Sequence, residues 1–327
     1  MGIREIETQG GGKGTRKENA MERMKKWGIG SLLMFTLFIW MSPVIGAAQT
    51  VTCPGDSLQD AIDAASAGDT ITVTGTCAEN VLIPLGKDEL VLDGGGTATI
   101  NGPNTTTYAT VMVRAKGVTV KGFNITGGYD GIWVVFGGHA RIEDNTIQGA
   151  ARNGISVGAG SSAQIINNTV QDCTSDGIAV NESSAGRIGV LSTFDTETYP
   201  NTIQNNGESG ILVTRSSSAL IVGNTISNNT LDGVRVVRAS HADIANNTIN
   251  DNQQNGVFVS MNSGVNLGND SGDTIYDLVN TTTVGHKNLK YAIKCSTGGY
   301  VDGRKGSLKG VKGVVSVGGG GIDGTIP

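Results

Sequence analysis

Arginines recur at one position of a repeated segment. Arg215 and Arg238 lie 23 residues apart, each five residues after a glycine, and Arg235 lies close by. A guanidinium binds a carboxylate through two parallel hydrogen bonds, and sugar acids carry carboxylates. Arg215 and Arg238 are therefore candidate catalytic residues, and Arg235 and Glu182 are candidate ligand-binding residues. The competing interpretation is a surface ion pair between Glu182 and Arg215, worth under ~1 kcal/mol.

A second candidate is the stretch 191–200 (LSTFDTETYP), which interrupts the regular spacing. It carries the aromatic residues Phe194 and Tyr199 and the carboxylates Asp195 and Glu197. Proteins hold sugars by stacking the ring on an aromatic face while a carboxylate accepts from hydroxyls. Loops on rigid scaffolds often carry function, so we predict ligand contacts here. The alternative is a tolerated surface insertion.

The residue before each repeated glycine is an acid, an amide or a serine. Aspartates occupy only alternate copies, so two carboxylates lie roughly 10 Å apart, too far to share one calcium ion. Asp and Asn before Gly are ordinary turn residues. We expect no cofactor, with Ca²⁺ entering only if the chain is a lyase. The residues of this row are Asp130, Asn153, Asp176, Ser209, Asp232 and Asn255.

Two histidines, His139 and His241, occupy equivalent positions four repeats apart, roughly 19 Å by strand spacing. Ser162, Ser184 and Ser218 are assigned to the same position in between. This separation argues against a shared metal ion, so both histidines are expected on the surface. No close pair of aspartates suits general acid and base roles either.

The candidate site residues lie in a repeated segment whose copies are 23 residues long, except for one copy of 33 residues. Nine residues after each asparagine of an Asn-Thr-Ile or Asn-Thr-Val triplet comes a glycine followed by Ile or Val. A fixed period of this length predicts a solenoid, whose repeats bury their apolar faces only by stacking. The asparagines are Asn145, Asn168, Asn201, Asn224 and Asn247.

Apolar residues within each repeat alternate, which is the period of a β-strand. The pair Ile155 and Val157 recurs in every copy, while the residue between them varies, so the pair points inward. Short Ala-x-Ile and Asn-Thr-Ile strands complete the turn, with Asn and Ile inward and Thr outward. Stacked interior asparagines would form amide ladders. Cys173 falls in a second interior position, either as a reactive thiol or as a small core filler.

The Asn-Thr-Ile and Gly-Ile-x-Val strands resemble those of bacterial, secreted, right-handed parallel β-helix proteins of the pectin-lyase-like group. The resemblance implies an all-β right-handed parallel β-helix. In pectate-lyase-like members an arginine acts as the base that removes the proton next to a carboxylate. Hydrolases of the group show Asn-Thr-Asp, whereas this chain has Ile or Val after Asn-Thr. The Asp-Pro-His-Asp run of alginate epimerases is also missing.

The first 48 residues are predicted to be a lead and a signal peptide, with the charged start, apolar run and small residues falling in 24–48. The β-helix with its N-terminal cap is assigned to 49–270, and a C-terminal rung and cap to 271–327. The first 48 residues carry seven Lys+Arg and four Asp+Glu, so cleavage changes the net charge from −5 to −8. An acidic protein is not built for nucleic acid. We expect a secreted, periplasmic or cell-surface protein without a transmembrane span after cleavage.

Residues 57–65 (SLQDAIDAA) predict a short amphipathic helix that covers the first rung, with Ser57 and Asp60 resembling a capping box. In a secreted protein, Cys53 and Cys77 are expected to form a disulfide that closes this cap. Cys295 has no evident partner in the sequence.

These observations predict a secreted monomer that binds extracellular polysaccharide without catalysis. One alternative is a polysaccharide lyase that acts on uronic-acid polymers with Arg215 or Arg238 as its base. The other is a structural or adhesive cell-surface scaffold with no sugar ligand. The residue types do not decide whether the protein is an enzyme.

Overall fold

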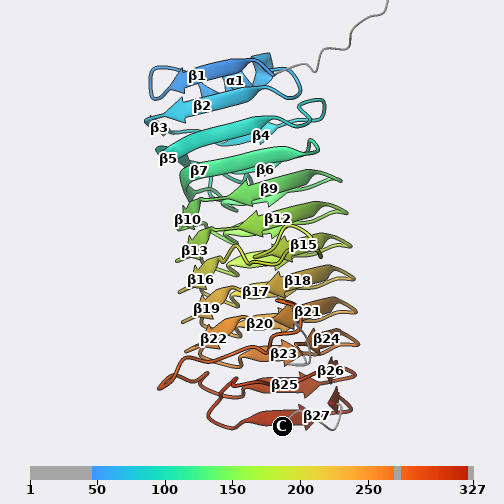
Figure 1. Ribbon diagram of the computed structural model, residues 1–327. Helices are drawn as coiled ribbons and strands as arrows, with labels where there is room; N and C mark the ends of the chain where they lie inside the picture. Colours follow the sequence, from blue (N-terminus) through green and yellow to red (C-terminus); the bar gives the residue numbers. More distant parts are fainter. Residues whose placement is uncertain (1–45, 269–273, 323–327) are drawn as a thin grey trace, which may run out of the picture. The chain divides into compact units, whose positions relative to one another are not determined.

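The computed structural model describes residues 46–268 and 274–322, and the predicted lead and most of the predicted signal peptide lie outside this part. Each repeat forms one turn of a right-handed parallel β-helix, as predicted, and about 12 turns stack on one another (Figure 1). The abundant glycines and β-branched residues favour short strands and tight turns over helices.

Each turn contributes strands to three faces, which we name by their sequence signatures. The Gly-Ile sheet has ten strands: β4 (Val81–Ile83), β6 (Val111–Val113), β8 (Ile132–Val134), β11 (Ile155–Val157), β14 (Ile178–Val180), β17 (Ile211–Val213), β20 (Val234–Val236), β23 (Val257–Val259), β25 (Ile293–Ser296) and β27 (Val314–Val317).

The Ala-Ile sheet comprises β1 (Ala48–Thr52), β2 (Thr70–Thr74), β9 (His139–Glu143), β12 (Ser162–Ile166), β15 (Ala185–Ile188), β18 (Ser218–Val222), β21 (His241–Ala245), β24 (Gly264–Leu267), β26 (Tyr300–Asp302) and β28 (Gly321–Ile322). The Asn-Thr sheet comprises β3 (Thr76–Cys77), β10 (Thr146–Gln148), β13 (Thr169–Gln171), β16 (Thr202–Gln204), β19 (Thr225–Ser227) and β22 (Thr248–Asn250). The longer strands β5 (Val91–Gly102) and β7 (Val118–Gly127) run through both of these sheets.

Equivalent residues of successive repeats stack in register. Ile155 pairs with Ile178, and Ile178 pairs with Ile211 across the 33-residue repeat. The constant Ile and Val side chains are fully buried, whereas Trp133 between its own pair is only half-buried. The constant pair is therefore confirmed as inward. The residue between the pair is not outward in every copy, because Ser156 in β11 and Ala179 in β14 are buried.

An interior ladder of asparagine amides runs along the stack. Nδ2 of Asn168 donates to Oδ1 of Asn201 at 3.1 Å, and Asn201 donates to Asn224 at 2.8 Å. Each Oδ1 also accepts the backbone N–H of the preceding asparagine, as Asn224 does from Asn201 at 3.1 Å. The ladder continues to Asn280, which the sequence repeat did not reveal. Every amide thus meets its hydrogen-bonding needs inside the core.

The N-terminal coil is closed as predicted. The helix α1 (Leu58–Ala64) buries one side, and Ser57 Oγ accepts from the backbone N–H of Asp60. Cys53 and Cys77 form the expected disulfide. The carboxylate of Glu79 accepts the N–H groups at the start of the helix, a capping contact that sequence reasoning missed. At the other end, β25–β28 continue the Gly-Ile and Ala-Ile sheets although the sequence repeat has ended.

Within the described residues, no helix is both long enough and apolar enough to span a membrane.

Candidate functional site

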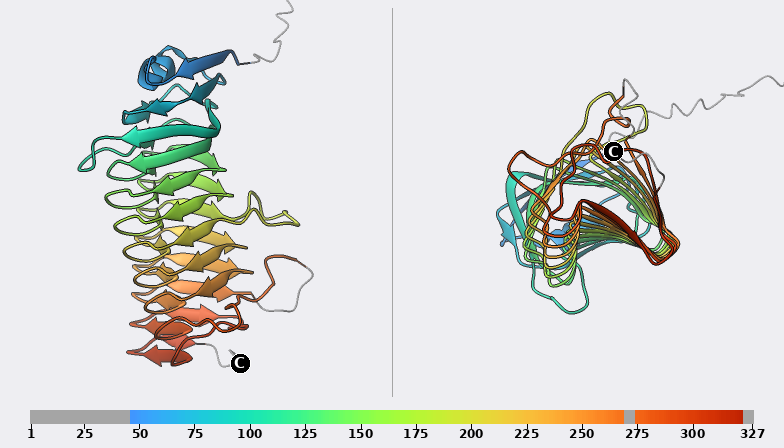
Figure 2. Two further views of the ribbon diagram at one scale, coloured as in Figure 1. Left: turned by 90° about the vertical axis from the view of Figure 1, so that its left-hand side faces the viewer. Right: turned by 90° about the horizontal axis from the view of Figure 1, so that it is seen from below.

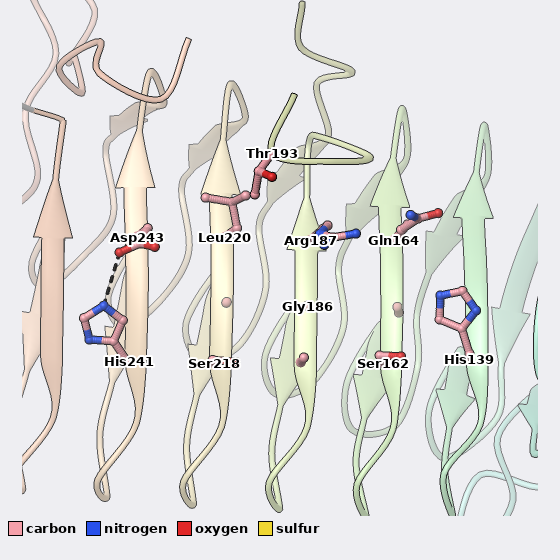
Figure 3. A pocket seen from close by; sticks show the side chains of 13 residues that line it. His139, Ser162, Gln164, Gly186, Arg187, Thr193, Ser218, Leu220, His241 and Asp243 are labelled. Carbon is pink, nitrogen blue, oxygen red and sulfur yellow. Dashed lines mark hydrogen bonds and ion pairs between the residues drawn. The ribbon is translucent and has the colours of Figure 1, made fainter. Parts of the chain in front are cut away.

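A groove of about 410 Å³ lies on the outer face of the Ala-Ile sheet (Figure 3). It crosses the strands β9, β12, β15, β18 and β21, with His139 at one end and His241 at the other (Figure 3). Its lining is His139, Ser162, Ala163, Gln164, Ala185, Gly186, Arg187, Thr193, Ser218, Ala219, Leu220, His241 and Asp243. Hydroxyl, amide, imidazole and guanidinium groups therefore share one open surface with short apolar side chains.

In the middle of the groove, strand β15 contributes the small residues Ala185 and Gly186 together with Arg187. Strand register places Ala185 between Ser162 and Ser218 in one column of outward residues. Within the groove, His139 and His241 lie at the two ends of this column. The assignment of Ser184 to this column was wrong by one residue. The Ser184 side chain is buried instead, and its Oγ accepts the backbone N–H of Ser161 at 3.2 Å.

The loop 191–200 forms one wall of the groove through Thr193, and it projects from the regular stack of coils (Figure 2). Two side chains of the groove floor hold the base of this loop. Gln164 Nε2 donates to the carbonyl oxygen of Leu191 at 2.9 Å, and Arg187 Nη1 donates to the same oxygen at 3.1 Å. The wall is thus fixed to the sheet that it borders.

Asp195 holds the loop in shape. Its carboxylate accepts the N–H groups of Leu191 and Ser192 at 2.6 and 3.1 Å and the Ser192 hydroxyl at 2.7 Å. Partial burial acts to raise the pKa of Asp195, but these hydrogen bonds outweigh it and lower the pKa. Phe194 is 90% exposed at the tip, which leaves its ring open to a ligand.

A second hollow of about 350 Å³ adjoins the groove and shares Thr193, Leu220 and Asp243 with it. Its far side is formed by Tyr276 and Asp277, and the Tyr276 hydroxyl donates to the carbonyl oxygen of Ser192. The two hollows together make a channel along the coil axis, bordered by two loops that contact each other.

Asp243 lies where the two hollows meet. Its Oδ1 is 3.1 Å from His241 Nε2 and accepts from Asn266 Nδ2 at 2.8 Å. These contacts fix the carboxylate and leave Oδ2 without a hydrogen-bond partner in the described part of the chain. The arrangement offers donors and acceptors in one row, as binding of a polyhydroxylated chain requires.

The predicted arginine row lies elsewhere, on the turn between the Gly-Ile and Ala-Ile sheets. Arg215 Nη1 is 3.5 Å from Glu182 Oε1, and both side chains are more than half exposed, so the ion pair of the competing interpretation is present. Arg238 is exposed on the next turn. Glu182, Arg215 and Arg238 line neither hollow of the channel.

The remaining predicted ligand-binding residues do not form a single site. Arg235 lies on the outer face of the Gly-Ile sheet, 2.9 Å from Asp232 and 4.6 Å from the centre of the Phe258 ring. Glu197 and Tyr199 belong to the loop 191–200, with Glu197 exposed and Tyr199 half-buried. The loop therefore contributes to the channel, whereas Arg235 is on another sheet.

Sequence reasoning missed most groove residues because it treated the Ala-Ile strands as core. The residue between the inward Ala and Ile of each copy points outward, and in three copies it is Gln164, Arg187 and Asp243. The same alternation that identified inward residues could have identified this row.

The side chains of the residues that precede the repeated glycines are buried. Several of their oxygens accept backbone N–H groups from neighbouring coils. Asp176 Oδ1 accepts the N–H of Ser209 at 2.9 Å, and Asp130 Oδ1 accepts the N–H of Asn153 at 3.1 Å. Burial raises the pKa of Asp176 to about 7. Burial also raises the pKa of the Cys173 thiol to about 11, which favours the core-filler interpretation over a reactive thiolate.

One group of three potential metal-ligand atoms within 4.8 Å occurs in the described part of the chain, formed by Cys53, Cys77 and Glu79. The two sulfurs are joined in the disulfide, and Glu79 accepts hydrogen bonds from Leu58 and Gln59. These atoms are already committed to structural bonds, so the group does not suit a metal ion.

Comparison with known proteins gives one family and several more distant similarities. The model of the family described as NosD, periplasmic copper-binding protein, matches residues 63–277, more than half of the chain. A cell surface glycoprotein of Methanothermus fervidus is 32% identical over 130 residues, which are 38% of this chain and 21% of that protein. This chain therefore matches about a fifth of the length of that relative.

Two solved structures are similar to this chain, and the first of them shares its fold. XylC in complex with xylose has a TM-score of 0.56 and 14% identity, over 78% of this chain and 68% of the other. An alginate lyase from Paenibacillus sp. FPU-7 has a TM-score of 0.46 and 15% identity, over 85% and 99% of the two chains. At these identities the similarity concerns the fold alone.

Proposed function

Because the chain belongs to the NosD family, described as periplasmic copper-binding protein, we propose that it works outside the cytoplasm, where it binds a polysaccharide along the Ala-Ile sheet without catalysing a reaction. The observation that carries the proposal is the channel formed by the groove and its adjoining hollow. The similarity to a cell surface glycoprotein and the disulfide between Cys53 and Cys77 support the location.

The channel has the chemistry and the direction that an extended glycan needs. It runs along the stack, and each coil advances by roughly 4.8 Å, comparable to the length of one sugar unit. Ser162, Ser218 and Gln164 offer groups that hydrogen-bond hydroxyls, while Leu220 offers an apolar contact. The exposed ring of Phe194 lies on the loop that borders the channel. A chain of similar fold, XylC, was solved with xylose bound.

Binding without catalysis is favoured over the lyase alternative by the position of the arginines. Arg215 and Arg238, the candidate bases, lie outside both hollows, and Arg215 is paired with Glu182. A base can remove a proton only when it lies within hydrogen-bonding distance of the atom that carries that proton. A glycan in the channel would therefore be out of position for either arginine.

Copper binding, which the family description implies, does not fit the described residues. The three-atom group contains disulfide sulfurs, and copper requires soft or imidazole ligands that are free to coordinate. Two of the histidines, His139 and His241, mark opposite ends of the groove, and His286 contacts Asp251. We therefore assign no step to copper.

Affinity electrophoresis tests the proposal with gels that contain alginate, polygalacturonate or xylan. We expect at least one polymer to retard the full-length protein. Ala185→Trp should abolish the retardation, because an indole at the exposed Ala185 position, on the middle strand of the groove, would obstruct it. Thr225→Trp is the matched control, since Thr225 is an exposed strand residue on the Asn-Thr sheet.

Equal retardation of the two variants would refute the groove as the binding site. Ultraviolet absorbance of the same polymers after incubation tests the lyase alternative. Unsaturated uronate that disappears in Arg238→Ala would show catalysis and overturn the non-catalytic proposal. Neither retardation nor product would favour the structural or adhesive scaffold.

A further inference from the structure

We propose that the outer face of the Gly-Ile sheet carries a second binding site, for a sugar ring that bears a carboxylate. The site is formed by Trp133 on β8 and by Tyr108, Tyr129 and Phe136 in the loops beside the Gly-Ile strands, which together we call the aromatic patch. It lies on a different sheet from the channel and does not depend on the function proposed for the channel.

Tyr129, Trp133 and Phe136 are linked by ring and cation–π contacts, and a backbone hydrogen bond places Tyr108 next to Tyr129. The ring centres of Trp133 and Phe136 are 6.4 Å apart. The backbone N–H of Tyr129 donates to the carbonyl of Tyr108 at 2.7 Å, which places these two residues side by side in successive coils. The Arg152 guanidinium joins the two pairs, since it lies 4.6 Å from the centre of the Tyr129 ring and 5.9 Å from that of Trp133.

A hollow of about 240 Å³ opens beside these rings. Met112, in its wall, pairs with Trp133 in the adjacent strand, so the hollow and the patch share an edge. Tyr108 is 55% exposed and Phe136 is 59% exposed, so apolar ring surface faces solvent. The hollow is lined by Asn80, Val81, Leu82, Tyr108, Ala109 and Met112. Sugar rings stack their C–H faces on surfaces of this kind.

Arg114 gives the site a positive charge, which favours a negatively charged ligand. Its guanidinium lies 5.1 Å from the centre of the Phe136 ring, and its Nε is buried without a hydrogen-bond partner. Among residues 46–268 and 274–322, Arg114 takes part in no ion pair. Arg152, by contrast, is balanced by Asp130, whose Oδ1 accepts from its Nε at 2.9 Å.

An unpaired guanidinium beside exposed rings matches a uronate unit. The sugar face would stack on the rings, and its carboxylate would accept from the terminal Nη groups of Arg114, which has no carboxylate partner in the described chain. A neutral sugar would use the rings but leave the arginine without an anion. A uronate therefore fits both parts of the site.

Isothermal titration calorimetry on the full-length protein tests this inference with galacturonate oligomers and with their methyl esters. All titrations use the Ala185→Trp background, so that the channel does not contribute. Arg114→Gln should weaken binding of the free acid about 10-fold or more and leave binding of the ester unchanged. Trp133→Ala should weaken both ligands. Lys116→Gln is the control, because Lys116 is an exposed cation close by in sequence.

The inference is overturned if Arg114→Gln titrates like the control, or if the ester binds as tightly as the acid in the parent protein. Melting temperatures equal to that of the parent show that a loss of binding is not a loss of folding. If Trp133→Ala melts early, Trp133→Phe replaces it and should retain binding. If the channel is not the polysaccharide-binding site, Ala185→Trp and Thr225→Trp will be retarded equally in the gels, which is a separate result.

Discussion

Asp176 is a buried carboxylate without an arginine beside it. Its equivalents Asp130 and Asp232 contact Arg152 and Arg235, respectively. Asp176 accepts the N–H of Ser209, but no described cation pairs with it, and burial raises its pKa from 3.8 to about 7. Between these two values the folded protein keeps a proton that the unfolded chain has lost. The stability of the fold therefore decreases as pH rises through this interval.

Asp176→Asn should remove this pH dependence. Asparagine keeps the acceptor for the Ser209 N–H, and Asn153 and Asn255 already occupy the same row. We expect the variant to gain roughly 2–4 kcal/mol in free energy of unfolding above pH 7 and almost nothing near pH 4. Thermal unfolding of both proteins across this range measures the difference. An equal gain in free energy of unfolding at pH 4 and above pH 7 would contradict a protonated Asp176.

At the scale of single elements, the interior amide ladder stabilises the strands of the Asn-Thr sheet. Asn224 donates to Asn247 at 3.0 Å and accepts from Asn201, whereas the neighbouring Thr225 faces solvent. Asn224→Leu should cost about 3 kcal/mol because it leaves buried amide groups of Asn201 and Asn247 unpaired. Thr225→Leu should change stability by less than about 0.5 kcal/mol. Urea unfolding compares the two, and equal losses would rule out the ladder as a stabilising element.

The ladder also shows what the sequence allows one to predict. Alternation of Asn, Thr and Ile was enough to assign inward and outward side chains, and Cys53 and Cys77 were correctly paired. Asn280 escaped notice because its triplet reads Asn-Thr-Thr and no glycine follows nine residues later. Asn288 accepts from Asn252 in a second interior ladder, 36 residues further along the chain. Ladder residues are set by register in space, so unequal loop lengths hide them from a search for a fixed period.

The channel was harder to predict than the coils. Its wall depends on Gln164 and Arg187 reaching the carbonyl of Leu191, and its border on Tyr276 contacting Ser192. Such contacts between a strand and an inserted loop leave no periodic trace. The sequence therefore pointed to the loop 191–200 but not to the sheet beneath it.

At the scale of the whole molecule, stacking stabilises the coils and aligns their outward side chains in rows. The strands of each coil pair with those of the adjacent coils, and each coil contributes one outward side chain to each row. Ala185 among serines is one such outward residue, and the groove along the Ala-Ile sheet is lined by these rows and by Thr193 of the inserted loop. Different sheets of one stack can thus carry different sites, as we propose for the channel and the aromatic patch.

The channel is tested most directly by hydrogen–deuterium exchange of the full-length protein with and without the polysaccharide that retards it in gels. Contact with a glycan should slow exchange in the loop 191–200 and in β15 and β18, because the ligand shields these backbone amides and damps their local opening. Protection confined to the Asn-Thr sheet, or no protection at saturating polysaccharide, would contradict a glycan site on the Ala-Ile sheet.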